Sequence, residues 1–197
     1  MVYDYKTGKK GFSAEGVESG SDLQMLLYLF AECAKDLPAA DVLPAGVSYV
    51  RAGAQPALKA ESTEGADDAA QAKSWYSEHS LSGAVFDSPR VVSAFEKIEA
   101  ALCEETDYRP KNGHNHLLKL SAARFGEFRS FVEKQVILPK IKSLLDGEIS
   151  AVPLENDKKL PCVYCQFWAC CGNRNGKFGS AVCTGSKVED FETKKDA

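Results

Sequence analysis

The sequence predicts an α/β protein with several flanking helices and a cysteine-rich C-terminal segment. Two β-prone segments, 2–7 and 46–51, alternate with segments whose apolar residues recur at helical spacing. Four of the seven cysteines stand within ten residues near the C-terminus. We therefore expect an α/β part over residues 1–153, a cysteine-rich segment over 154–183 and a mobile tail over 184–197.

Composition and charge describe an ordinary globular chain. Of its 197 residues, 44% are hydrophobic and 26% charged, which suits one domain with a real core. The formal net charge of −4 provides no overall basic field of the kind that autonomous nucleic-acid binders carry. No apolar run reaches transmembrane length and no signal peptide is evident, so we expect a cytoplasmic protein with no membrane partner. In that compartment the cysteines indicate metal or cluster ligation more than disulfides.

The opening strand carries the first candidate site. Side chains alternate along a strand, so Asp4 and Lys6 are expected on one face, roughly 6.6 Å apart. A carboxylate there would hold a hard divalent cation such as Mg²⁺, and a lysine would stabilise developing negative charge or position the attacking water. This pair is what metal-assisted phosphodiester hydrolysis needs. The alternative interpretation is a surface ion pair on an ordinary edge strand.

A helix is expected after the loop at 8–11, with N-cap choices in 19–22 and an end near Lys35. Its apolar stripe comprises Leu23, Leu26, Leu27, Phe30 and Ala34. Gln24 and Tyr28 are four residues apart and share a second face. A solvated glutamine and a half-buried tyrosine are the ordinary interpretation. The functional interpretation is that both side chains look back at the Asp4–Lys6 end of the strand.

The middle of the chain alternates between short strands and loops. The second strand is expected at 46–51, and the Ala-rich, acidic stretch 54–73 is expected to be a flexible insertion. Trp75 and Tyr76 are candidates to anchor a short helix, and 81–86 reads as a connector or short strand.

Two further helices and a hairpin follow. One helix is expected from Pro89, with Ser88 as N-cap, to about Cys103. Segments 107–109 and 114–120 flank a Pro-Lys-Asn-Gly turn and predict a hairpin, in which His114 and His116 alternate like metal ligands but are more typical of solvent-facing residues. The longest helix is expected over 121–147, kinked at Pro139, and then an extended piece over 149–152. Its expected inward residues are Phe125, Phe128, Val132, Val136, Ile141, Leu144 and Leu145.

The cysteines form the second candidate site. Cys162 and Cys165 form a CxxC pair, Cys171 follows after five residues, and Cys170 lies beside it. A CxxC turn directs two thiolates at one metal ion or one cluster face. Three ligands are one short of a tetrahedral zinc or a cubane cluster, so either Cys183 completes a local zinc site or the fourth thiolate lies outside this chain. Free buried thiols are the remaining alternative.

In their order and spacing, these segments resemble the RecB-type nucleases of the PD-(D/E)XK superfamily, and more narrowly the C-terminal nuclease part of AddB-type components of bacterial helicase–nucleases. The resemblance is carried by Asp4-Tyr5-Lys6-Thr7-Gly8, by Gln24 to Tyr28, by CxxCx5C, and by residues 44–49, 83–89 and 144–149. It covers the chain to about residue 175 and implies a partial restriction-endonuclease-like core.

The resemblance also implies roles for individual residues. Asp4 matches the metal-binding aspartate and Lys6 the catalytic lysine of a D-x-K motif. Gln24 and Tyr28 match a Q-x-x-x-Y motif that lies beside the active site, helps to order it and engages DNA. Three ligands of a 4Fe-4S cluster that staples the nuclease domain match Cys162, Cys165 and Cys171, and Cys170 is then a bystander.

The implied activity is Mg²⁺-dependent DNA exonuclease action within an ATP-dependent helicase–nuclease that resects double-strand breaks for recombinational repair. The implied partners are DNA and an AddA-like subunit.

The chain departs from the family pattern in two places. A metal-binding carboxylate in a Gly-x-x-Asp strand and a histidine, both upstream in the family, are not found here. The fourth cluster cysteine is also upstream in the family, and neither Cys33 nor Cys103 stands in its place. We therefore expect a fragment that is inactive alone and lacks an intact cluster. The alternatives are a non-catalytic scaffold that binds DNA or its companion subunit, and a zinc-binding interaction module that uses Cys162, Cys165, Cys171 and Cys183.

Overall fold

The structure is a computed structural model that describes residues 1–7, 11–34, 44–52, 72–73, 76, 79–106, 117–155 and 160–193. The expected insertion up to residue 71, Trp75, the hairpin turn, and both His114 and His116 lie outside these residues. The chain divides into two compact units. Unit 1 comprises residues 1–12, 24–125 and 192–197, and unit 2 comprises 13–23 and 126–191. The cysteine-rich segment thus shares a unit with parts of the α/β region.

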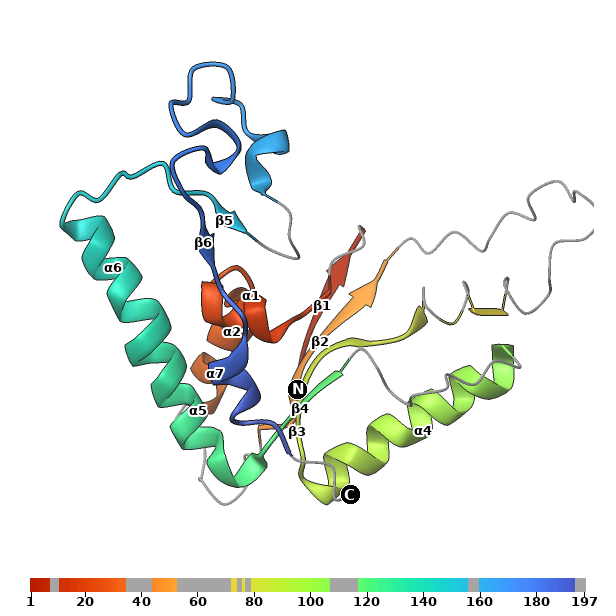
Figure 1. Cartoon of the computed structure of the whole chain (residues 1–197). Helices are drawn as coiled ribbons and strands as arrows, with labels where there is room; N and C mark the ends of the chain where they lie inside the picture. Colours follow the sequence, from red (N-terminus) through yellow and green to blue (C-terminus); the bar gives the residue numbers. More distant parts are fainter. Residues whose placement is uncertain are drawn as a thin grey trace, which may run out of the picture. The chain divides into compact units, whose positions relative to one another are not determined.

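Unit 1 is built on a mixed four-stranded sheet in the order β1-β2-β3-β4. The strands are β1 (Val2–Lys6), β2 (Gly46–Arg51), β3 (Ser82–Phe86) and β4 (Leu117–Leu120). β1 pairs parallel with β2, β2 antiparallel with β3, and β3 parallel with β4 (Figure 1). The predicted α/β class is confirmed, as are both predicted strands, and the segment at 81–86 is a strand rather than a connector.

The two central strands form the core of unit 1. Residues 46–49 of β2 and 83–86 of β3 are buried, which places side chains of both sheet faces in contact with other elements. Phe86 is fully buried, and its ring meets that of Phe125 edge-on with centroids 4.9 Å apart. The backbones of β2 and β3 approach so closely at Gly83 that an added Cβ would lie 2.0 Å from the carbonyl oxygen of Val47.

Helix α2 (Gln24–Cys33) packs against β1 and β2. Its buried residues are Met25, Leu26, Leu29 and Phe30, whereas Leu27 is 45% exposed. The predicted stripe is therefore correct at Leu26 and Phe30 but wrong at Leu27, because the sheet meets a face rotated toward Met25 and Leu29.

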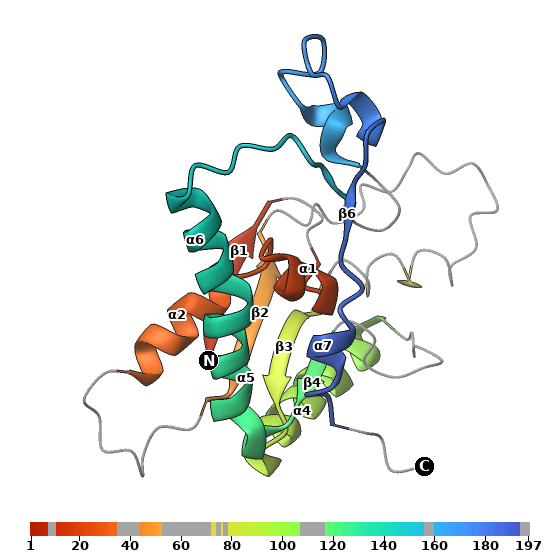
Figure 2. The same ribbon diagram turned by 60° about the vertical axis from the view of Figure 1, so that its left-hand side comes forward.

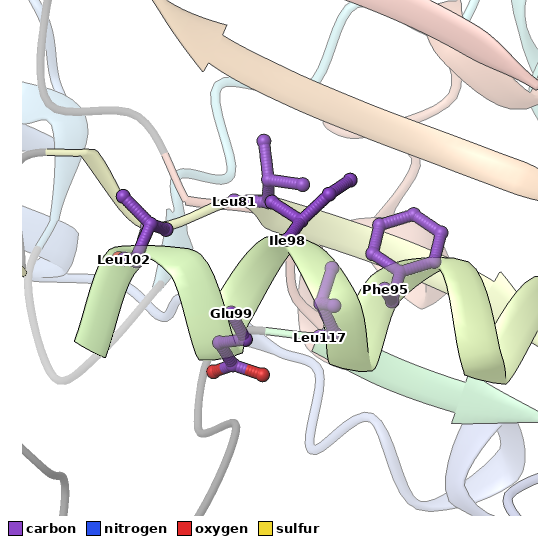
Figure 3. A pocket seen from close by; sticks show the side chains of 7 residues that line it. Leu81, Phe95, Ile98, Glu99, Leu102 and Leu117 are labelled. Carbon is purple, nitrogen blue, oxygen red and sulfur yellow. The ribbon is translucent and has the colours of Figure 1, made fainter. Parts of the chain in front are cut away.

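Helix α4 (Pro89–Thr106) begins at Pro89 as predicted and runs past Cys103. It lies beside β3, yet none of its side chains between residues 89 and 104 is fully buried. Figure 3 shows Phe95, Ile98 and Leu102 of α4 gathered with Leu81 around a small gap. The gap measures about 10 Å³, room for one water molecule, so it is a packing defect rather than a substrate site.

Unit 2 contains a helix that the sequence analysis missed, α1 (Ala14–Ser19). The Ser13 hydroxyl accepts a hydrogen bond from the Gly16 amide at 2.9 Å, which caps the helix start. Gly20 ends the helix with a φ of 89°, a left-handed conformation suited to glycine. The residues expected to start the next helix therefore end this one instead.

The predicted long helix is confirmed as a continuous run of helical segments. They are η1 (Ala122–Arg124), α5 (Phe125–Phe131), the π-helical η2 (Val132–Ile137) and α6 (Leu138–Leu145). The π-helical register lies directly before Pro139, which has no N–H to donate to the preceding turn. Phe128, Val132 and Val136 are buried as predicted. Ile141, Leu144 and Leu145 were expected inward but are 46%, 76% and 80% exposed.

The last described residues of the expected tail are structured. Helix α7 (Ser186–Glu189) packs against α1, with Val188 fully buried. The Phe191 ring lies 5.5 Å from the rings of both Phe128 and Phe131. These apolar contacts hold residues that the polar composition alone assigned to a mobile end.

A short parallel pair, β5 (Leu154–Glu155) and β6 (Ala181–Val182), joins the ends of the cysteine-rich segment. Residues 149–152, expected as a short extended piece, precede it and belong to no described strand. The intervening chain, with 3-10 turns η3 (Pro161–Tyr164) and η4 (Arg174–Gly176), forms a small lobe of loops (Figure 2). Of the helices that the structure describes, none is both long and apolar enough to cross a membrane.

The backbone contact at Gly83 provides a stability test. Gly83→Ala should lower the free energy of unfolding by roughly 1–3 kcal/mol, because the new methyl group collides with a backbone that cannot move aside. Gly126→Ala is the matched control. It lies in helix α5 with nothing within 4 Å of an added Cβ, so it should raise stability by about 0.5–1 kcal/mol. Urea denaturation measures the free energy of unfolding of both variants. Equal changes in the two variants would contradict the described β2–β3 packing.

Candidate functional site

The alternation of β1 brings Asp4 and Lys6 to one side of the sheet. Val2, Asp4 and Lys6 are half-buried, whereas Tyr3 and Tyr5, on the opposite side, are 50% and 70% exposed. The prediction that the carboxylate and the ammonium share a face is confirmed.

The two side chains form an ion pair with an unusual feature. Lys6 Nζ lies 2.5 Å from Asp4 Oδ2, with side-chain exposures of 26% and 28%. Apart from this ion pair, Asp4 Oδ2 is buried and accepts no hydrogen bond from the described residues. A buried carboxylate oxygen normally has a hydrogen-bond partner. In the described residues this oxygen is therefore neutralised by Lys6 alone.

Tyr49 positions the lysine, and the sequence analysis missed it. The parallel register places Tyr49 of β2 opposite Asp4 of β1. Lys6 Nζ lies 5.2 Å from the centroid of the Tyr49 ring, a cation–π contact. The ring is 5% exposed and packs against Phe12 at 6.2 Å, so it is held in place. The strand that carries Tyr49 was predicted. Its register with β1 could not be, because the two strands are far apart in the sequence and neither contains a signal for their pairing.

Gln24 and Tyr28 contact each other on the exposed side of α2. Gln24 Nε2 donates a hydrogen bond to the Tyr28 hydroxyl at 3.2 Å, and Tyr28 is 53% exposed. Their predicted sharing of a helix face is confirmed, and α2 packs against the strand that carries Asp4 and Lys6. An exposed, mutually bonded amide and phenol are available to a ligand from solvent.

Asp4 fits one position of a divalent-metal site. Its carboxylate oxygens are the hard donors that Mg²⁺ prefers, and Oδ2 accepts no hydrogen bond from the described residues. Across the described ranges, no three His, Cys, Asp or Glu side chains converge closely enough to hold a metal ion, so Asp4 would need a further ligand. β1 is the end strand of the four-stranded sheet, so its outer edge pairs with no strand among the described residues.

The cysteines do not form a ready-made site. Cys162 and Cys171 are half-buried, Cys165 and Cys170 are exposed, and all are free thiols. The CxxC turn exists, with the Cys165 amide donating to the Cys162 carbonyl at 3.2 Å. As arranged in the described lobe, the thiols and Cys183 are not gathered around one point. The donor set suits a soft metal or cluster, but its geometry does not yet fit one.

Asn173 organises the loops of the lobe. Its Nδ2 donates to the carbonyls of Ala151 at 2.8 Å and Gly179 at 2.9 Å, and its Oδ1 accepts from the Phe178 amide at 2.6 Å. No residue from 160 to 184 is fully buried, so these hydrogen bonds rather than a core hold the turn.

Residues 1–172 match the sequence profile of the PD-(D/E)XK nuclease superfamily. The chain is also similar to several curated proteins that are named as subunits of ATP-dependent helicase/deoxyribonucleases. It is 24% identical to that of Clostridium tetani over 200 residues, 99% of this chain and 16% of the relative. It is 26% identical to the relative from Thermoanaerobacter sp. strain X514 over 179 residues, which cover 86% of this chain and 15% of the relative. It is 27% identical to the relative from Carboxydothermus hydrogenoformans over 182 residues, which cover 86% of this chain and 16% of the relative. The chain spans about a sixth of the length of these relatives.

Asn173→Ala should release the loop that it holds. The Phe178 amide loses its acceptor, so hydrogen exchange of residues 173–179 should rise to nearly that of an unprotected peptide. Thr184→Ala, an exposed polar change just after β6, is the control and should leave that segment protected. The measurement is hydrogen exchange of residues 173–179 in both variants, followed by mass spectrometry. Unchanged protection in Asn173→Ala would show that the turn is held in another way.

Proposed function

The chain belongs to the PD-(D/E)XK nuclease superfamily, and on that premise we propose that it is the nuclease module of a bacterial ATP-dependent helicase/deoxyribonuclease of the AddB type. Its substrate is DNA, which it cleaves as an exonuclease during resection of double-strand breaks for recombinational repair. It works beside an AddA-like partner in the cytoplasm. The observation that carries the proposal is the half-buried ion pair of Asp4 and Lys6, in which Asp4 Oδ2 accepts no hydrogen bond from the described residues.

The proposed chemistry divides between these two residues. Asp4 would hold Mg²⁺, which when bound activates water and neutralises charge on the scissile phosphate. Lys6 stabilises the negative charge that develops on the phosphate oxygens during attack. The Tyr49 ring keeps the ammonium at the site while the carboxylate is engaged by the cation.

We propose that Asp4 shares the Mg²⁺ with a second carboxylate, because Mg²⁺ keeps several waters and is held by one or two carboxylates plus substrate. We propose that this ligand comes from a strand that pairs with the open edge of β1. The 197-residue chain alone is then a poor nuclease, although its D-x-K residues are in place.

The remaining motif residues have supporting roles in this proposal. Gln24 and Tyr28, bonded to each other and exposed, would order the site and contact DNA. Cys162, Cys165 and Cys171 would supply three thiolates to a 4Fe-4S cluster in the longer protein, with the fourth from outside the described residues. Because the thiols are not gathered in the described lobe, the loops would close around the cluster as it binds.

Cleavage by the longer protein that carries this chain tests the assignment. Asp4→Ala should abolish nuclease activity, and Lys6→Ala should lower kcat by about 10²–10³-fold, the usual effect of removing one group that stabilises transition-state charge. Lys142→Ala, which removes an exposed lysine of α6, should leave the rate unchanged. Loss of a labelled DNA end is the measurement. Full activity in Asp4→Ala would mean that the domain is a scaffold that binds DNA or its companion.

The isolated chain tests the second-carboxylate proposal. With Mg²⁺ and plasmid DNA it should show no cleavage above background, since Asp4 is its one matched metal ligand. Robust degradation that disappears in Asp4→Ala would overturn this expectation.

Metal analysis of the chain distinguishes the proposed iron–sulfur role of the cysteines from a zinc site. We expect no stoichiometric zinc, since three thiolates leave a zinc site incomplete. One zinc per chain that is lost in Cys183→Ser would identify a zinc-binding interaction module instead.

A further inference from the structure

The lobe between β5 and β6 exposes large aromatic rings. Phe178 is 75% exposed, Phe167 70%, Trp168 42% and Tyr164 89%. Single exposed apolar residues are ordinary, but several aromatic residues within one short segment mark an interaction surface.

The charge of the same segment is opposite to that of the chain. Residues 156–180, between β5 and β6, contain four basic residues and one acidic residue, although the whole chain has a net charge of −4. The basic residues are Lys158, Lys159, Arg174 and Lys177, and the acidic residue is Asp157. A concentrated positive charge within an acidic chain favours a polyanionic ligand at this place.

Two cations lie against two of these rings on one turn. Arg174 Cζ is 4.6 Å from the centroid of Trp168, and Lys177 Nζ is 5.3 Å from that of Phe178. The Lys177 amide donates to the Arg174 carbonyl at 3.2 Å, and Trp168 Nε1 donates to Asn175 Oδ1 at 3.4 Å. We call Trp168, Arg174, Lys177 and Phe178 the aromatic–basic surface.

We propose that the aromatic–basic surface binds single-stranded DNA by stacking unpaired bases on Trp168 and Phe178, with Arg174 and Lys177 contacting the phosphates. Exposed rings interleaved with cations are how proteins hold single strands without reading their sequence. Duplex DNA hides its base faces within the helical stack, so this surface selects the unpaired strand. The proposal rests on the proposed function for the choice of DNA as the polyanion, and it gives the module a second contact with its substrate.

The test is fluorescence anisotropy of a labelled oligothymidylate of about 15 nucleotides titrated with the full 197-residue chain in EDTA. Phe178→Leu keeps apolar bulk but removes the π face, so it should weaken binding by roughly 5- to 150-fold, the range for one lost stacked base. Phe178→Tyr keeps the face and should bind like the unmodified chain. Val163→Ala, which changes a 76% exposed aliphatic residue of the same lobe, is the matched control and should also have no effect.

The salt dependence tests the phosphate contacts. Replacing both cations, as Arg174→Gln with Lys177→Gln, should reduce the slope of log K against log salt by about 1.4, or about 0.7 per phosphate contact on a single strand. A chain that does not bind the oligonucleotide, binds duplex equally well, or tolerates Phe178→Leu would overturn the proposal. Equal weakening by Val163→Ala would do the same and would indicate a protein-docking surface.

Repeating the titration with Asp4→Ala distinguishes failure of the single-strand-binding proposal from failure of the proposed nuclease role. Binding that depends on Phe178 and survives in this variant supports the aromatic–basic surface whether or not the chain supports cleavage. Cleavage that depends on Asp4 in the longer protein, without oligonucleotide binding sensitive to Phe178, would leave the nuclease role standing and refute the surface.

Discussion

Backbone hydrogen bonds between β1 and β2 decide which side chains of β1 turn toward the half-buried side of the sheet. In the observed register, Val2, Asp4 and Lys6 lie opposite Val47, Tyr49 and Arg51. Because side chains alternate with a period of two, a slip of one residue would turn Tyr3 and Tyr5 inward and expose both charged residues. The ion pair of Asp4 and Lys6 and the contact of Lys6 with the Tyr49 ring both depend on this pairing.

The burial of Tyr49 links the sheet to the chemistry. An exposed lysine would spend most of its time in water, and its pairing with an aspartate would contribute little. Here the tyrosine ring, fixed by Phe12, gives the ammonium a second favourable contact beside the carboxylate. The lysine can therefore remain at the site when a cation takes the carboxylate, which is the arrangement that phosphodiester hydrolysis needs.

Local patterns predicted the parts of this chain that local forces decide. Strand alternation placed Asp4 and Lys6 together, the start at Pro89 followed from its fixed φ, and the long helix followed from apolar spacing.

The features that the sequence did not predict have tertiary causes. Helix α1 is six residues long and has little periodicity, and its stability comes from packing against α7. Leu144 and Leu145 continue the apolar pattern of the long helix, but no described element covers them. The register that brings Tyr49 to Lys6 joins residues far apart in the sequence and has no local signal.

The cysteine-rich lobe, unlike the sheet, is held together without a buried core. Its described residues between 160 and 184 have no buried member, so hydrogen bonds from Asn173 and the short β5–β6 pair hold it together. A segment without a core leaves its aromatic and basic residues available to ligands. In the proposed cluster-bound form, few packed contacts would have to break for the loops to bring the cysteines together.

The central claim is that Asp4 of β1 binds a divalent metal ion beside Lys6. The most direct measurement is paramagnetic broadening of backbone amide resonances in this chain on titration with Mn²⁺, which reports even weak binding by proximity. The account predicts that broadening centres on residues 4–6 and on Tyr49, and that Asp4→Asn abolishes it. Broadening centred elsewhere, with β1 unaffected, would contradict the account.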